Sequence, residues 1–103
     1  MNSKKNFLPI GSIVILKDAS KKMMITGYLT SVDGETVFDY SGCLFPEGIL
    51  SSKQMCLFNH DQIGKLYFTG YEDDEQKNFK DNLNKVLNNI EEDKKNFEVL
   101  EEI

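Results

Sequence analysis

The sequence contains no arginine, only two cysteines and only one histidine, and each shortage argues against a class of function. Proteins that bind nucleic acid place clustered lysine and arginine against the phosphates. Here 12 lysines are outnumbered by 17 acidic residues, which gives a formal net charge of −5. We therefore expect no binding of nucleic acid.

The few cysteine and histidine residues also argue against a metal site. A structural zinc ion takes four ligands, usually from two closely spaced pairs, and Cys43, Cys56 and His60 do not provide this spacing. We expect two reduced thiols, no metal and no cofactor. A catalytic Cys56–His60 dyad is conceivable, but Asn, His and Asp at positions 59–61 are typical of a turn. We therefore expect no enzymatic activity.

Long apolar runs are missing as well. The longest is residues 13–16, whereas a membrane-spanning helix needs about 20 apolar residues. The first residues include two lysines but no apolar stretch of signal-peptide length. We expect no membrane insertion and a cytoplasmic location.

The chain divides into two parts of different charge and composition. Residues 1–71 contain seven lysines, six acidic residues and every Gly and Pro, whereas residues 72–103 contain five lysines and eleven acidic residues. This change predicts a β-rich body over residues 1–71 and an acidic amphipathic helix over residues 72–103. We expect the helix to pack on the body as one domain.

The body shows the pattern of an antiparallel sheet. Short apolar and β-branched runs between turn residues predict five strands, at about residues 12–17, 23–32, 35–40, 55–58 and 65–69. Such strands form either a small curled antiparallel sheet or an SH3-like barrel. With the helix, the predicted fold class is α+β.

Asp33-Gly34 is the strongest local signal in the body. This dipeptide favours a two-residue type I′ turn between paired strands. Counting outward from such a turn pairs Gly27 with Tyr40. A glycine inside a strand indicates a bend or bulge.

The tail has a helical apolar period. Apolar residues that recur in steps of three, four and seven form a heptad seam with a polar break at Asp93, and they are Phe79, Leu83, Val86, Ile90, Phe97 and Leu100. A helix of about 28 residues is about 42 Å long, more than a small body can cover. We expect Phe79, Leu83 and Val86 to touch the sheet as well as a partner, and the outer residues to need a partner.

A second candidate contact lies in the body. Residues 41–48 are predicted to form a loop that carries Leu44, Phe45 and Pro46. This loop is too apolar for a linker, so we expect these three residues to form a further protein-binding patch.

Four separated motifs occur in a fixed order along the body: LPIGSIV at residues 8–14, MITG at 24–27, FDYSGCLFPEG at 38–48, and FNHDQIGKLYFTGYEDDE at 58–75. In these motifs the sequence resembles a small Firmicute family called domain of unknown function 4176. Phe38 stands where that family usually has tyrosine. The resemblance does not extend beyond Lys77.

The resemblance implies a function but no enzymatic activity. The family is similar to accessory proteins encoded beside LXG toxins of the type VIIb secretion system. Its members are implied to bind the helical N-terminal region of the toxin and to target it for export. We therefore expect a chaperone-like targeting protein whose partner is that region, alone or with other small helical accessory proteins. The alternative is a regulatory or ligand-binding module that uses the barrel mouth near Tyr40 and Phe45.

Overall fold

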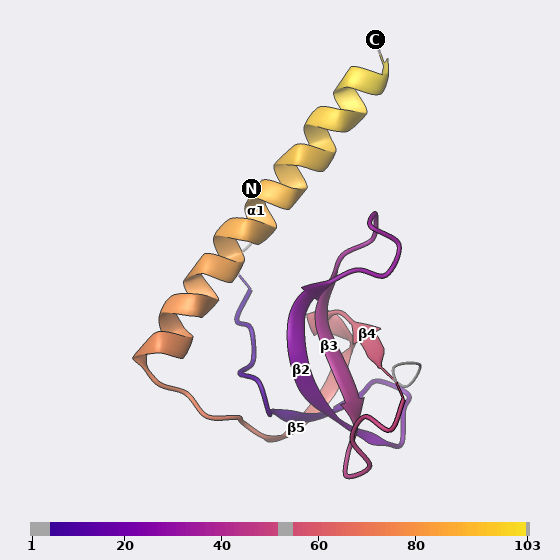
Figure 1. Cartoon of the computed structure of the whole chain (residues 1–103), viewed down its shortest axis with the longest axis vertical. Coiled ribbons are helices and arrows are strands. Elements are labelled where there is room, and N and C mark those ends of the chain that lie inside the picture. Colours follow the sequence, from indigo (N-terminus) through magenta and orange to yellow (C-terminus); the bar gives the residue numbers. More distant parts are fainter. Residues whose placement is uncertain (1–4, 52–54, 103) are drawn as a thin grey trace.

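The computed structural model describes residues 5–51 and 55–102, with the helical backbone alone for residues 91–102. The elements, in chain order, are β1 (Ile13–Leu16), β2 (Lys22–Thr30), β3 (Phe38–Leu44), β4 (Cys56–Phe58), the 3₁₀ helix η2 (His60–Gln62), β5 (Ile63–Phe68) and α1 (Asp74–Glu102). Figure 1 shows a β body with one long helix beside it. The predicted α+β fold is confirmed.

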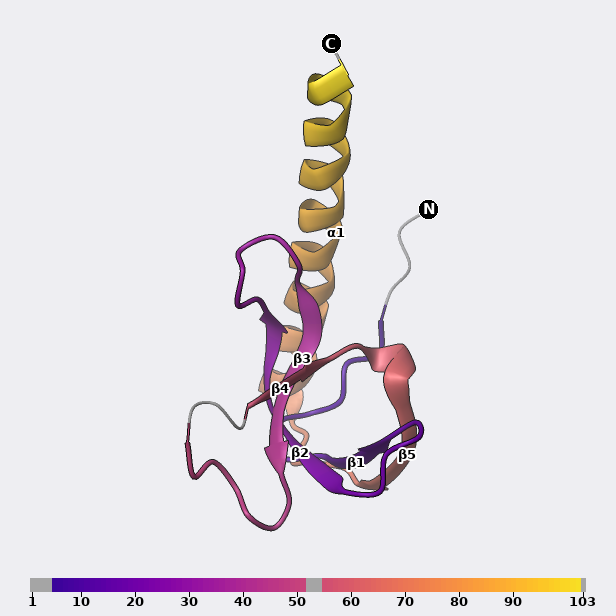
Figure 2. The ribbon, with the colours of Figure 1, turned by 90° about the vertical axis from the view of Figure 1, so that its right-hand side faces the viewer.

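The five strands form one antiparallel sheet in the order β4-β3-β2-β1-β5. Figure 2 shows that the sheet is strongly curled, so that β5 and β3 lie on different sides of the bend. The register shifts between Ile25 and Gly27, which confirms the bend predicted at this glycine. A Cβ atom on Gly27 would also collide with the Ser41 side chain, so this crossing requires glycine.

The predicted pairing of β2 with β3 is wrong by one residue. β2 ends at Thr30, which pairs with Phe38, and Tyr40 lies opposite Tyr28 instead of Gly27. A one-residue shift moves a side chain to the other face of the sheet. Here it gathers the two tyrosines over the core, with their ring centroids 6.0 Å apart.

The connection between β2 and β3 is wider than the predicted two-residue turn because the Asp33 side chain organises it. Its carboxylate accepts the backbone N–H groups of Glu35 and Thr36, both at 2.8 Å. Gly34 has the expected positive φ of 78°. A type I′ turn requires a positive φ at both central residues, and Asp33 does not have one.

The loop predicted over residues 41–48 is also shorter in the structure. β3 continues to Leu44, and Ser41 and Gly42 pair with Leu57 and Cys56 of β4. A Cβ atom on Gly42 would come within 3.0 Å of both the Phe58 ring and a β2 carbonyl. Glycine therefore allows three strands to pack closely where the sequence suggested a turn.

The core lies between the inner face of the sheet, the N-terminal segment and α1. Its buried residues are Phe7, Val14, Met23, Ile25, Tyr40, Phe58, Leu83 and Leu87. Phe7 belongs to a segment for which the sequence pattern predicted no role. Its ring packs edge-on against both Tyr28 and Tyr40.

α1 begins as the sequence predicts. Asp74 and Glu75 lie in its first turn, where carboxylates favour the positive end of the helix dipole. The Asp73 carboxylate accepts the backbone N–H of Gln76 at 2.8 Å. In the part of the chain that the structure describes, no helix is both long and apolar enough to cross a membrane.

Candidate functional site

The side of α1 that meets the body runs through Leu83, Asn84 and Leu87, which are all buried. Phe79 and Val86 lie at the margin of this contact and are 51% and 47% exposed. The Phe79 ring still approaches that of Tyr28, with centroids 6.0 Å apart. The helix is therefore turned away from its predicted heptad seam, and part of that seam faces outward.

The N-terminal segment fixes this rotation. The Lys5 backbone N–H donates to Asn84 Oδ1 at 2.7 Å, and Asn84 Nδ2 donates to the Lys5 carbonyl at 2.9 Å. The Lys80 ammonium adds a bond to the Asn6 side chain at 2.8 Å. Asn84 thus bonds to the backbone of the extended segment as a neighbouring strand would. These bonds hold the side of α1 that carries Asn84 against the body.

Two tyrosine hydroxyls attach the same segment to the sheet. The Tyr28 hydroxyl donates to the Leu8 carbonyl at 2.6 Å, and the Tyr40 hydroxyl accepts the Leu8 N–H at 3.0 Å. The Tyr40 hydroxyl also lies 2.6 Å from His60 Nδ1. Through the Leu8 N–H on one side and His60 Nδ1 on the other, the Tyr40 hydroxyl joins the N-terminal segment to η2.

Burial raises the pKa of Tyr40 well above its usual range. The hydroxyl therefore stays protonated at neutral pH and keeps both of its bonds. His60 is part of this structural network, and the Gln62 side chain accepts the Asn59 N–H at 2.7 Å in the same turn. The turn predicted at residues 59–61 is confirmed.

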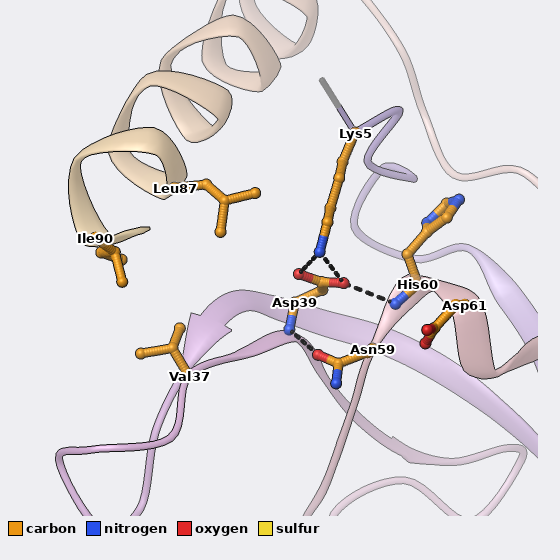
Figure 3. Close-up of a pocket in the computed structure, with 8 residues that line it drawn as sticks. All are labelled: Lys5, Val37, Asp39, Asn59, His60, Asp61, Leu87 and Ile90. Atoms are coloured by element: carbon orange, nitrogen blue, oxygen red, sulfur yellow. Dashed lines mark hydrogen bonds and ion pairs between the residues drawn. The ribbon is translucent and has the colours of Figure 1, made fainter. Parts of the chain in front are cut away.

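A cavity of about 380 Å³ lies where α1 leaves the body, and we call it the junction pocket (Figure 3). It is lined by Lys5, Val37, Asp39, Asn59, His60, Asp61, Leu87 and Ile90. One wall is apolar and is formed by Val37, just before β3, and by Leu87 and Ile90 of α1, and the other is polar.

The polar wall of the junction pocket is built on Asp39, which is only 3% exposed. Its two carboxylate oxygens lie 2.9 and 3.0 Å from the Lys5 ammonium, and one of them accepts the His60 backbone N–H at 2.8 Å (Figure 3). A buried carboxylate with these partners is satisfied. Its arrangement is that of a structural ion pair, which ties the N-terminal segment to β3 and η2.

Cys43 is buried and Cys56 is half-buried, and neither forms a disulfide. Among the described residues, no group of three or more His, Cys, Asp or Glu side chains could hold a metal ion.

The predicted apolar loop is divided between the core and the surface. Leu44 is half-buried and packs against the core, while Phe45 and Pro46 are exposed. Phe45 lines a second cavity of about 460 Å³, which we call the β5 groove. It is lined by Gly11, Ile13, Lys22, Met24, Phe45, Tyr67 and Phe68.

The structure does not bring the two predicted partner-binding patches together. Among the α1 residues whose side chains are described, up to Ile90, none lines the β5 groove. Figures 1 and 2 place the connection after β3 at the end of the molecule opposite the C-terminal half of α1. Tyr40 is fully buried and does not line the groove, so Tyr40 and Phe45 do not share one barrel mouth.

The helical patch is only partly covered by the body. Of the predicted seam, Leu83 is buried, Ile90 lines the junction pocket, and Phe79 and Val86 are exposed. We call the exposed side through Phe79 and Val86 the α1 face. The side chains of the two outer seam residues, Phe97 and Leu100, lie outside the described residues.

Sequence reasoning missed two aromatic residues that line the β5 groove, Tyr67 and Phe68. Both were placed in a predicted strand, but three consecutive apolar residues do not show which face of that strand is covered. Asn84 was also missed, because a single polar residue inside an amphipathic helix resembles any solvent-facing residue.

Comparison with known proteins adds one finding. Residues 7–79 match the family described as Domain of unknown function (DUF4176). No curated protein and no solved structure matches the chain. The matched range covers the whole β body, the N-terminal segment from Phe7 and the start of α1.

Proposed function

This chain belongs to the family of domain of unknown function 4176, and from that premise we propose that it is a non-enzymatic targeting protein in the cytoplasm. It binds the helical N-terminal region of an LXG toxin and promotes export of that toxin by the type VIIb secretion system. The contact with the toxin is made by helix packing along α1.

The observation that carries this proposal is the α1 face. Phe79 and Val86 lie seven residues apart, on one side of the helix, and about half of each side chain is exposed. Large apolar side chains at this spacing are the usual seam of helix–helix contacts. Leu83 and Leu87 are buried against the body, whereas Phe79 and Val86 remain available for contact with another helix.

The length of α1 supports the same reading. The helix has 29 residues, which at 1.5 Å per residue is about 43 Å. Its C-terminal half extends beyond the sheet in both Figures 1 and 2. A partner helix beside it gains a long apolar contact, and Phe97 and Leu100 are predicted to continue that contact.

The junction pocket offers a further anchor at the middle of this surface. Ile90 and Val37 form its apolar wall next to the α1 face. A bulky side chain of the partner helix fits such a pocket, and buried anchors of this kind dominate interface energies. The acidic residues of the tail mainly affect orientation and association rate, and salt screens their effect.

Copurification with a tagged toxin N-terminal region tests the proposal. We expect Phe79→Ala/Val86→Ala and Phe97→Ala/Leu100→Ala each to weaken binding about 30-fold, because truncated interface anchors typically cost about 2 kcal/mol or more. Circular dichroism first checks that each variant is folded.

Val32→Ala is the matched control, since Val32 is 86% exposed at the tip of the β2–β3 connection. It should bind like the parent protein. If both helix variants also bind like the parent protein, α1 is not the toxin-binding surface and the proposal fails.

A further inference from the structure

The β5 groove is an apolar surface on the side of the sheet away from α1. Its floor is formed by Ile13 and Met24, and its walls by Tyr67, Phe68 and Phe45. Phe68 is 61% exposed, and the other two aromatic residues are 47% and 40% exposed. Three exposed aromatic rings around one hollow are typical of a protein-binding surface.

The rim of the groove is positively charged. The Lys22 and Lys65 ammonium groups lie 5.1 and 4.8 Å from the centre of the Tyr67 ring. Lys22 is the one charged residue among the residues that line the groove. Beside the groove, Glu47 is paired with Lys21 at 2.8 Å. The groove therefore suits apolar side chains that are flanked by carboxylates.

The α1 face has this chemistry. Phe79 and Val86 supply the exposed apolar side chains. Glu75 lies one helical turn before Phe79 and so on the same side of the helix. The charge of the tail also complements the positively charged rim of the groove, because residues 72–103 hold eleven acidic residues and only five lysines.

Within one chain, α1 packs on the other side of the sheet, and no described side chain of this helix lines the groove. We propose that the β5 groove binds the α1 face of a second copy of this chain. Phe79 and Val86 of one copy enter the groove of the other, and Glu75 pairs with the lysines of its rim. This inference does not depend on the proposed toxin. Since the same face is proposed to bind the toxin, the two contacts exclude each other.

Sedimentation velocity of the full chain over a range of concentrations and salt tests this. We expect an average mass that rises with protein concentration at low salt and falls toward the monomer as salt increases, because salt screens exposed charges. Phe68→Ser and Phe79→Ser should each weaken self-association at least about tenfold. Val32→Ser removes a still more exposed apolar side chain outside both surfaces and should change nothing.

A charge exchange identifies the pair of surfaces. Lys65→Glu and Glu75→Lys should each weaken self-association. A mixture of the two variants should associate again, because the unchanged α1 face of the first meets the unchanged groove of the second, and the reversed groove meets the reversed helix. A chain that stays monomeric at every concentration overturns the proposal. Self-association that is unchanged by Glu75→Lys also overturns it, because that result would indicate pairing through the open edge of β5. A groove that binds only another protein overturns it as well.

Discussion

At the residue scale, the molecule depends on a few polar side chains that hold its N-terminal segment. Leu8 gives both of its backbone polar groups to tyrosine hydroxyls, as a strand would give them to its neighbour. Buried backbone groups must be paired, so an extended segment outside the sheet needs side-chain partners of this kind. Tyr28 and Tyr40 provide them and at the same time form the aromatic core around Phe7.

Replacing Tyr40 with Phe tests this role. The ring remains in the core, but the Leu8 N–H and His60 Nδ1 lose their partner. We expect the free energy of unfolding in urea to fall by about 1–3 kcal/mol, the usual cost of a buried group left unpaired. Tyr67→Phe, which removes a hydroxyl from the exposed groove, is the control and should change it by less than about 0.5 kcal/mol. Equal effects of the two changes would contradict the assignment.

The same tyrosines predict a loss of stability at alkaline pH. Burial raises the pKa of both Tyr28 and Tyr40 above the ordinary value of 10.0. In the unfolded chain they ionise near that value, whereas in the folded chain they stay protonated. Their contribution is therefore complete below pH 10.0 and declines as the pH rises above it. Urea unfolding at increasing pH should show this decline, and it should be weaker in Tyr40→Phe. An identical decline in both proteins would assign it to other groups.

At the scale of elements, the sequence predicts the strands and the helix well but places them less well against one another. The five strands, the helix start and the bend at Gly27 follow from local composition and pattern. The register of β2 and β3 does not, because the Asp33 side chain replaces a tight turn with a wider one. Local turn preference alone cannot show which of the two the chain adopts.

The rotation of α1 could not be predicted for a related reason. Leu83 belongs both to the heptad seam and to a stripe with Leu87, so the pattern permits two docking faces. The choice depends on Asn84 and its bonds to Lys5, in a segment without periodicity. For the same reason the β5 groove was not predicted, and Phe45 is the one residue of its lining that was among the predicted binding residues. Nothing in the sequence showed which side of the sheet α1 would cover.

The wider turn after β2 makes a pH-dependent prediction. Hydrogen bonds from Thr36 and Glu35 lower the pKa of Asp33 from 3.8 to about 2. The order that these bonds give the turn is complete above pH 3.8 and is lost as the pH falls toward 2. The protection factors of the Glu35 and Thr36 amides, which are the intrinsic exchange rate at each pH divided by the rate measured by NMR, should fall over this range.

Two variants of Asp33 separate the charge from the shape of this side chain. Asp33→Ala should show no protection of either amide at any pH, because no acceptor remains. Asp33→Asn keeps one acceptor oxygen and should lose only the pH dependence. If the protection factors of these amides in the parent protein are independent of pH over this range, the carboxylate does not organise the turn.

At the scale of the whole molecule, α1 has two tasks that lie in different parts of its length. Its first half completes the core through Leu83 and Leu87, and the N-terminal segment lies between it and the sheet. Its second half extends past the body (Figure 1). Folding should therefore depend on the first half of the helix, and the proposed toxin contact on both.

Shortening the chain separates these tasks. A chain that ends at residue 71 loses two buried leucines, and each such loss typically costs about 2–5 kcal/mol. Because small domains have a total stability of only about 5–15 kcal/mol, this chain should be unfolded or aggregated. A chain that ends at residue 90 keeps both leucines and Asn84, so its urea midpoint should stay close to that of the full chain. It should nevertheless bind the toxin region more weakly in copurification, because Phe97 and Leu100 are gone. If the chain that ends at residue 71 is as stable as the full chain, α1 is not part of the core. If the chain that ends at residue 90 binds the toxin region fully, the contact is confined to Phe79, Val86 and the junction pocket.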